Sequence, residues 1–221
     1  MEVPEVVVGR LPQYVRVLRD LQKKGNRLVS SKELGELLQM TPAQIRKDLS
    51  YFGRFGKQGR GYNVVGLLDQ LKGILALDRE WRIALVGVGR LGRAILGYPG
   101  FAPEGFQIVA AFDDDQRQVG QALAGLIVQP MSEMPRIVAE KDIRIAIVAV
   151  PAAQAQNVVN QLVSCGVKSV LNYAPVTVQT PNGVRVRGID PVLSLQSMTY
   201  YLGADSTSAH QKRSQRVAAR A

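Results

Sequence analysis

The chain has 221 residues, of which 46% are hydrophobic, enough for one large or two small globular domains. No apolar run approaches the roughly 20 residues of a membrane span, and the opening MEVPEVVVGRLPQ does not have the composition of a secretory signal. The single Cys165 cannot form an internal disulfide, and the lone His210 lies in a polar tail. We therefore expect a cytoplasmic protein with no metal site and no membrane partner.

The positive charge is concentrated at the two ends of the chain. The net charge is +10, and residues 1–80 hold fourteen Lys or Arg against nine Asp or Glu. Residues 81–205 hold ten against nine, and residues 206–221 hold four basic residues and no acid. A basic module beside a nearly neutral one predicts a polyanion as the partner of the first. The alternative is a solvated surface that is merely basic.

Three short helices are predicted in the first 52 residues. The second begins at Ser30-Ser31, and the third opens with the cap Thr41 followed by Pro42. The predicted apolar faces are Tyr14, Val17, Leu18 and Leu21 in the first helix, Leu34, Leu37 and Leu38 in the second, and Ile45, Leu49 and Phe52 in the third. Only two residues separate the second helix from Thr41, so the helices must cross steeply, as in a helix-turn-helix unit.

A glycine-rich basic segment follows the third helix. Residues 53–64 read GRFGKQGRGYNV, with Phe55 and Tyr62 flanking the basic tip, which predicts a β-hairpin. Three helices and a basic hairpin are typical of a winged helix-turn-helix. A linking helix over 67–77 is expected to lead into the second module.

From residue 81 onward the pattern changes to apolar runs that alternate with helices. We predict strands over 82–86, 107–112, 126–128, 143–150 and 169–172, with a helix over 152–165. This pattern predicts an α/β fold, a Rossmann-like parallel sheet covered on both faces. The last 18 residues are expected to be disordered.

The third helix carries the residues that we expect to contact DNA. With its apolar face buried, the outward positions are Ala43, Arg46, Lys47, Ser50 and Tyr51. Arg can bind guanine with two hydrogen bonds, and Lys and hydroxyl groups can hold phosphates. Lys57 and Arg60 at the hairpin tip could approach a minor groove. A solvated amphipathic helix is the alternative interpretation.

Residues 86–92, VGVGRLG, follow a predicted strand and match the Gly-x-Gly-x-x-Gly motif for dinucleotides. Gly87 would allow the tight turn, Gly89 the approach of the pyrophosphate and Gly92 the packing of helix on strand. The candidate cofactor-binding loop also includes Val88, Arg90 and Leu91, which lie between these glycines. A Gly-rich turn without a ligand is the alternative.

An acidic residue about 20 positions after the loop completes the dinucleotide motif. Asp113 could bind the adenosine ribose and repel a 2′-phosphate, which favours NAD over NADP. Asp114 or Asp115 could take this role instead, depending on the strand register.

No catalytic cluster accompanies the nucleotide motif, so we expect no enzyme activity and no catalytic residue. A small NAD-dependent oxidoreductase with a helical dimerisation module is the alternative. A further alternative is that coenzyme A or another nucleotide replaces NAD as ligand, because segments like Asn172 to Pro175 occur in domains that bind coenzyme A.

With both motifs placed, the sequence closely resembles the Rex family of redox-sensing transcriptional repressors. The matching stretches are TPAQIRKDLSYFG, GRGYNV, VGVGRLG, IVAAFDDD and VLNYAP. The resemblance implies a homodimer whose DNA binding is released by NADH, with NAD+ competing for the same site. Two-fold symmetry then predicts an inverted-repeat operator on double-stranded DNA.

The resemblance also implies a sensing network and a C-terminal helix that crosses to the partner, whereas the other boundaries follow from the residue pattern. Arg16, Tyr98 and Asp190 would form the network, and Tyr98 would also lie at the cofactor site. The expected parts are a DNA-binding domain over 1–80, an NAD(H)-binding domain over 81–189, a helix over 190–203 that crosses to the partner, and a basic tail over 204–221. The wing departs from many relatives, with Gln58 at a commonly basic position and Arg60 at a commonly apolar one.

Overall fold

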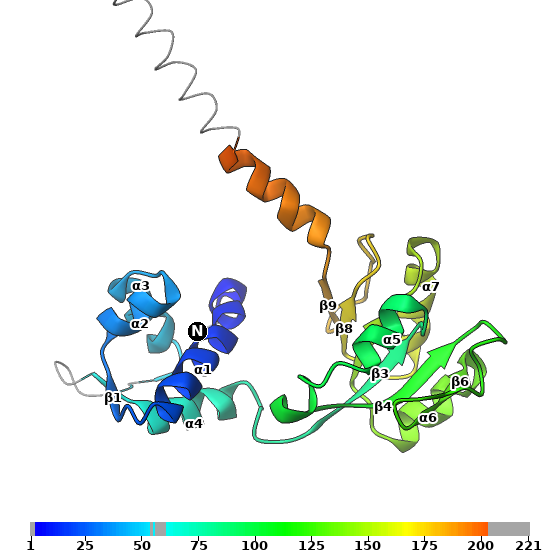
Figure 1. The fold of residues 1–221 in the computed structure, drawn as a ribbon, viewed down its shortest axis with the longest axis horizontal. Coiled ribbons are helices and arrows are strands. Elements are labelled where there is room, and N and C mark those ends of the chain that lie inside the picture. Colours follow the sequence, from blue (N-terminus) through cyan, green and yellow to red (C-terminus); the bar gives the residue numbers. More distant parts are fainter. Residues whose placement is uncertain (1–2, 54, 56–60, 203–221) are drawn as a thin grey trace, which may run out of the picture. The chain divides into compact units, whose positions relative to one another are not determined.

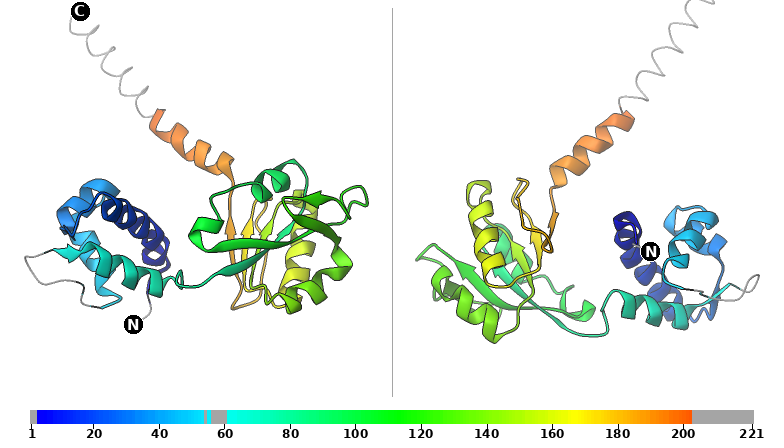
Figure 2. Two further views of the ribbon diagram at one scale, coloured as in Figure 1. Left: turned by 60° about the horizontal axis from the view of Figure 1, so that its bottom comes forward. Right: turned by 180° about the vertical axis from the view of Figure 1, so that it is seen from behind.

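The computed structural model describes residues 3–53, 55 and 61–202 (Figures 1 and 2). The chain forms two compact units, Met1–Glu80 and Trp81–Ala221. In the described part of the chain, no helix is long and apolar enough to cross a membrane.

The first unit packs four helices and a two-stranded ribbon around one core. Its elements are α1 (Glu5–Lys23), β1 (Leu28–Val29), α2 (Ser31–Leu38), α3 (Pro42–Ser50), β2 (Tyr62–Asn63) and α4 (Val64–Ile74). Strands β1 and β2 pair antiparallel, with Val29 opposite Tyr62. The core is formed by buried side chains of all four helices, including the wholly buried Tyr14, Leu34, Ile45 and Leu68.

The turn between α2 and α3 depends on two local features. Helix α2 ends at Leu38, and the next residue, Gln39, caps it in a left-handed conformation with φ of 54°. Gly35, on α2, lies so close to the turn that a Cβ there would overlap the carbonyl oxygen of Met40. The absence of a side chain at Gly35 therefore allows the two helices to cross within so short a connection.

Two expectations for the first unit need correction, and a third concerns residues that lie partly outside those the structure describes. Helix α4 covers 64–74 and not 67–77, because Asn63 caps it by accepting a hydrogen bond of 2.8 Å from Gly66 N–H. Leu37 is 54% exposed and does not belong to the apolar face of α2. In the predicted hairpin, β2 pairs with β1, and residues 54 and 56–60 lie outside the described residues.

The second unit is built on a seven-stranded sheet with the order β5-β6-β4-β3-β7-β8-β9. The strands are β3 (Trp81–Val86), β4 (Phe106–Asp113), β5 (Ala122–Leu123), β6 (Leu126–Pro130), β7 (Ile145–Val148), β8 (Ser169–Asn172) and β9 (Arg185–Gly188). All neighbours pair parallel except β5 with β6. Because β3 lies between β4 and β7, the strand order reverses beside β3, where ligands bind in open α/β sheets.

Helices cover both faces of this sheet (Figure 2). Helices α6 (Met134–Glu140) and α7 (Ala152–Ser164) pack with Ala84 and Val86 of β3. Helix α5 (Arg90–Leu96) packs on the other face, with Ile83 and Leu85. The alternation of β3 side chains between two apolar layers explains why its sequence is apolar throughout.

The α/β fold class is confirmed, and the differences in the second unit concern single elements. Strand β7 covers only 145–148, because Ile143 N–H already bonds to Val138 in the turn that follows α6. Helix α7 ends at Ser164, with Cys165 as its cap. The sequence pattern missed α6, β5 and β9, which are short and carry weak periodicity.

Residues 191–202 form a helix after β9. Its large apolar side chains are all exposed, with relative exposures between 55% and 73%. They are Val192, Leu193, Leu195, Met198, Tyr200, Tyr201 and Leu202. Such a continuous apolar surface is unusual for an isolated chain and indicates an interface.

Candidate nucleic-acid interface and nucleotide-binding loop

Helix α3 presents a polar, basic surface on the side opposite the core. Thr41 caps it by accepting a hydrogen bond of 3.2 Å from Gln44 N–H, and Ile45 and Leu49 are buried. The five side chains expected at DNA lie away from the core: Ala43, Arg46, Lys47 and Ser50 are exposed and Tyr51 is half-buried. The helix therefore carries cations and hydroxyl groups at the spacing of one outward face.

Two of these side chains have defined neighbours. The Arg46 Nη1 donates to Ser31 Oγ at 3.1 Å, so a residue at the start of α2 directs this guanidinium. The hydroxyl of Ser50 donates to the carbonyl oxygen of Lys47 at 2.7 Å. Phe55 packs against the core of the unit, whereas Lys57, Gln58 and Arg60 lie outside the described residues.

Asp48 is a buried carboxylate on α3 that the sequence analysis missed. It accepts hydrogen bonds from Arg10 Nε and Nη2 at 2.6 Å each, from Tyr14 OH at 2.9 Å and from Gln44 Nε2 at 2.7 Å. Burial alone would raise the pKa of Asp48, but these hydrogen bonds outweigh it and hold the pKa below its ordinary value. The anchoring of α3 to α1 is thus ionic as well as apolar.

The same cluster raises the pKa of Tyr14, through burial first and then through the hydrogen bond to Asp48. A signal for the cluster was present in the sequence, because Asp48 lies between buried positions 45 and 49 on the inward face of α3. A charged residue at such a position needs a partner.

The three glycines of the loop after β3 differ in what surrounds them. Gly87 has φ of 90°, and a Cβ there would lie 2.6 Å from the carbonyl oxygen of Ala149, after β7. A Cβ at Gly92 would overlap the carbonyl oxygen of Gly87, so helix α5 packs directly on the loop. Gly89 is exposed and would have no atom within 4 Å of its Cβ. Only Gly89 therefore leaves room for the backbone to be approached from outside.

The loop leads straight into α5, whose first turn has no side-chain cap. Val88 is buried, whereas Arg90 and Leu91 are exposed at the start of the helix. Uncapped amides at a helix start, next to an open glycine, are suited to hold phosphate oxygens.

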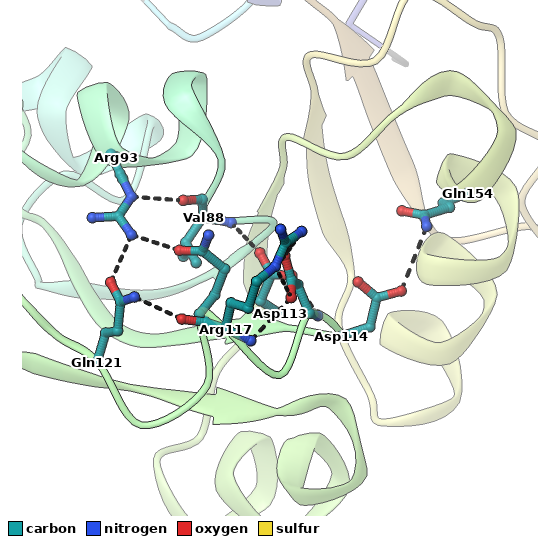
Figure 3. A network of polar contacts seen from close by, with 9 residues as sticks. Val88, Arg93, Asp113, Asp114, Arg117, Gln121 and Gln154 are labelled. Carbon is teal, nitrogen blue, oxygen red and sulfur yellow. Dashed lines mark hydrogen bonds and ion pairs between the residues drawn. The ribbon is translucent and has the colours of Figure 1, made fainter.

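Three consecutive acids at the end of β4 have different partners, and Figure 3 labels two of them, Asp113 and Asp114. Asp113 Oδ2 accepts from Val88 N–H at 2.7 Å, so this carboxylate is the one beside the glycine loop. Asp114 lies 3.5 Å from Gln154 Nε2, at the start of α7. Asp115 pairs with Arg117, with Oδ2 2.8 Å from Nη2. Of the three acids, Asp113 is thus the one that is hydrogen-bonded to the glycine loop.

Arg93 on α5 is a further member of this network that the motif did not reveal. Its Nε donates to Val88 O at 3.2 Å, and its Nη2 donates to Gln118 at 2.5 Å and to Gln121 at 2.7 Å. These bonds connect the glycine loop to the segment that follows β4 (Figure 3).

The members of the expected sensing network belong to both units, Arg16 to the first and Tyr98 and Asp190 to the second. Tyr98 is 58% exposed, and its ring meets that of Phe101 edge-on with centroids 5.1 Å apart. Asp190 Oδ1 accepts from Val192 N–H at 2.9 Å, at the start of the helix over 191–202. No hydrogen bond joins Tyr98 to Asp190 among the described residues, and Arg16 is exposed on α1 of the first unit.

The two units together define a class: a DNA-binding regulator that carries its own nucleotide-binding domain. Residues 2–50 match the family model described as "Putative DNA-binding protein N-terminus", and residues 78–176 match that described as "CoA binding domain".

The relatives and solved structures identify the family. The chain is 53% identical over 208 residues to the redox-sensing transcriptional repressor Rex of Roseiflexus sp. (strain RS-1), with 94% of each chain covered. It is 54% identical over 202 residues to the repressor Rex of Chloroflexus aurantiacus (strain ATCC 29366 / DSM 635 / J-10-fl), covering 91% of this chain and 95% of the relative. The chain therefore belongs to the Rex family of redox-sensing transcriptional repressors.

Solved structures of a Rex-family repressor, RSP, have the same fold. The complex of RSP with β-NAD+ and operator DNA matches with a TM-score of 0.88 at 34% identity, over 96% of this chain and 98% of that one. The complex with β-NADH matches with a TM-score of 0.84 at 32% identity, over 94% and 97%.

Proposed function

We propose that this chain is a homodimeric repressor whose affinity for an inverted-repeat operator falls when NADH binds. The observation that carries the proposal is one chain with both a helix whose outward face is basic and a glycine loop closed by the carboxylate of Asp113. The RSP complexes with operator DNA, β-NAD+ and β-NADH support the same pairing of ligands.

In this proposal residues 1–80 bind the operator through α3. Arg46 reads bases in the major groove, and Lys47, Ser50 and Tyr51 hold phosphates or base edges. Ala43 is short enough to let the start of α3 enter the groove. Lys57 and Arg60 would contact the minor groove from the wing.

Residues 81–189 would bind NAD(H), and the loop geometry fits such a ligand. Gly89 is open where the pyrophosphate would approach, and the amides of Arg90, Leu91 and Gly92 begin a helix without a side-chain cap. Each oxygen of Asp113 accepts one backbone N–H, which leaves a second lone pair for a ribose hydroxyl.

The helix over 191–202 would supply the dimer interface, within a segment 190–203 that crosses to the partner, because its large apolar side chains are exposed to solvent. Arg16, Tyr98 and Asp190 would sense the nicotinamide ring of the dinucleotide. NADH and NAD+ differ there by one positive charge and by planarity, and each would favour a different arrangement of the units.

Regulation without catalysis follows from this proposal, because membership in a family of repressors gives the bound dinucleotide the role of an effector. Among the described residues, no group of three or more His, Cys, Asp or Glu could hold a metal ion. As a regulator of transcription the chain would act in the cytoplasm, where bacterial DNA lies.

A mobility-shift titration tests the proposal. A palindromic operator DNA is saturated with the protein, and NADH is added with and without excess NAD+. We expect NADH to release the DNA and NAD+ to oppose the release. DNA affinity that stays the same at saturating NADH would overturn the sensor role. Calorimetry with NADH, NAD+, NADPH and coenzyme A separates the dinucleotide site from a coenzyme A site.

A further inference from the structure

Arg117 lies at the edge of the candidate ribose site, and its guanidinium forms an ion pair with Asp115. Its Nε lies 3.1 Å from both oxygens of Asp115, and its Nη2 lies 2.8 Å from Oδ2. The pair is accessible to solvent, with side-chain exposures of 88% for Arg117 and 31% for Asp115. Hydrogen bonds from Arg117 lower the pKa of Asp115, so this carboxylate is ionised at neutral pH.

The backbone of Arg117 is fixed independently of its guanidinium. Its N–H donates to Asp115 Oδ1 at 2.9 Å, and its carbonyl oxygen accepts from Gln121 Nε2 at 2.6 Å. Gln121 is in turn bound by Arg93. The guanidinium can therefore leave Asp115 by side-chain rotation alone, while the loop keeps its shape.

The pair is next to the carboxylate that marks the ribose position. Asp113 Oδ1 accepts from Asp115 N–H at 2.9 Å, and Asp113 Oδ2 accepts from Val88 N–H. Arg117 is thus linked to Asp113 through Asp115, whereas Asp114 is linked to Gln154 (Figure 3). A phosphate on the 2′-hydroxyl of a ribose bound by Asp113 would thus lie within reach of Arg117.

We propose that Asp115 is a specificity-determining residue that keeps Arg117 from binding a 2′-phosphate and so helps the site to reject NADP(H). This inference rests on the proposed binding of NAD(H) at Asp113. Asp113 alone repels a 2′-phosphate, but a free arginine beside it would offset that repulsion, because guanidinium groups bind phosphate with two hydrogen bonds. Asp115 prevents this binding in two ways, because its negative charge repels the phosphate and because its carboxylate already holds the guanidinium of Arg117.

The test compares three variants with the full-length wild type. Asp115→Asn keeps an oxygen for the N–H of Arg117 and removes the charge. Asp115→Asn/Arg117→Gln also removes the guanidinium. Asp114→Asn is the matched control, since it deletes the same charge one residue away, on the side of Gln154. Dissociation constants for NADH and NADPH are measured by calorimetry, and thermal melting checks that each variant is folded.

We expect Asp115→Asn to bind NADPH about five- to tenfold more tightly than the wild type does, with NADH affinity within about twofold. The double variant should lose this gain, and Asp114→Asn should not show it. NADPH affinity that Asp115→Asn leaves unchanged, or a gain that persists without Arg117, would overturn the proposal. A wild type that binds neither dinucleotide would instead refute the proposed function, and this inference with it.

Discussion

The guanidinium of Arg10 and the carboxylate of Asp48 form a two-point ion pair, with Nε and Nη2 each 2.6 Å from a different carboxylate oxygen. The Asp48 side chain is fully buried, whereas that of Arg10 is 22% exposed. The pair joins α1 to α3 within the first unit. It holds the helix that carries Arg46 and Lys47 through a residue that faces away from them.

Removing Arg10 should destabilise the first unit more than removing both partners. In Arg10→Met the carboxylate stays buried without its cation, and we expect the free energy of unfolding to fall by about 2–4 kcal/mol. Arg10→Met/Asp48→Leu should recover part of this loss, because no charge is left buried. Calorimetric melting of the full chain measures the stability of both variants. Equal losses in the single and the double variant would show that the buried charge of Asp48 does not need Arg10.

The stability of the same unit should depend on pH through Asp48. Its pKa in the folded chain is lowered from the ordinary value of 3.8, so its contribution is present above about pH 4. That contribution is lost as the pH falls through the lowered pKa. The difference in unfolding free energy between wild type and Asp48→Asn should therefore shrink below pH 4, and a constant difference from pH 7 to pH 2 would disagree.

Gly35→Ala and Gly73→Ala should change stability in opposite directions. A Cβ at Gly35 meets the backbone of Met40, so we expect a loss of about 1–3 kcal/mol. Gly73, on α4, would have no atom within 4 Å of its Cβ, and alanine there should add about 0.5–1 kcal/mol. Urea denaturation checks both values, and a Gly35→Ala variant as stable as the wild type would show that the helices can cross without a glycine.

Arg46→Ala and Lys47→Ala should weaken operator binding and leave NADH affinity intact. If Lys47 holds a phosphate, its loss should lower affinity for all sequences and reduce the salt slope by about 1. If Arg46 reads a base, its loss should cost about 1–3 kcal/mol and relax specificity at one position. Lys168→Ala, in the second unit, is the control of equal charge. Fluorescence anisotropy at several salt concentrations measures these effects, and an equal loss in the control would point to net charge alone.

Asp113→Ala should weaken NADH binding by about tenfold or more while the protein still binds DNA. The variant loses a ribose acceptor and the acceptor for the N–H groups of Val88 and Asp115. Asp113→Asn keeps one oxygen and should lose less. Calorimetry with NADH separates the two variants. An Asp113→Ala variant with wild-type affinity for NADH would mean that another acid binds the ribose.

Leu195→Glu should convert the protein to a monomer, because it places a charge in the exposed apolar surface of the helix over 191–202. Ile127→Glu is the control, since it places the same charge at an exposed apolar side chain of β6, outside this helix. Sedimentation velocity distinguishes the two species. A Leu195→Glu dimer would mean that another surface joins the protomers.

The helices of the first unit and the central strands of the second could be predicted because their signals are local. Thr41 and Pro42 begin α3, and the apolar run before Gly87 forms β3. The order of roles within the glycine motif also follows from local geometry, since Gly87 has positive φ and Gly92 packs on the loop.

Long-range pairs could not be predicted in this way. Arg10 and Asp48 are 38 positions apart, and Arg93 meets Gln118 across 25. Each depends on how two elements pack, which the period of a single element does not encode. For the same reason, the sequence left three acids open for one role, and only the bond from Val88 N–H distinguishes Asp113 from its neighbours.

The contact between Gly92 and the carbonyl oxygen of Gly87 has a consequence for how such proteins diverge. The helix needs glycine at position 92 in order to fold, whether or not a dinucleotide binds. A descendant that acquired a different effector would therefore keep Gly87 and Gly92, and its ligand preference would change at Gly89 and at residues 113–117. Within such a lineage, the acids and the arginine after β4 record a change of ligand better than Gly87 and Gly92 do.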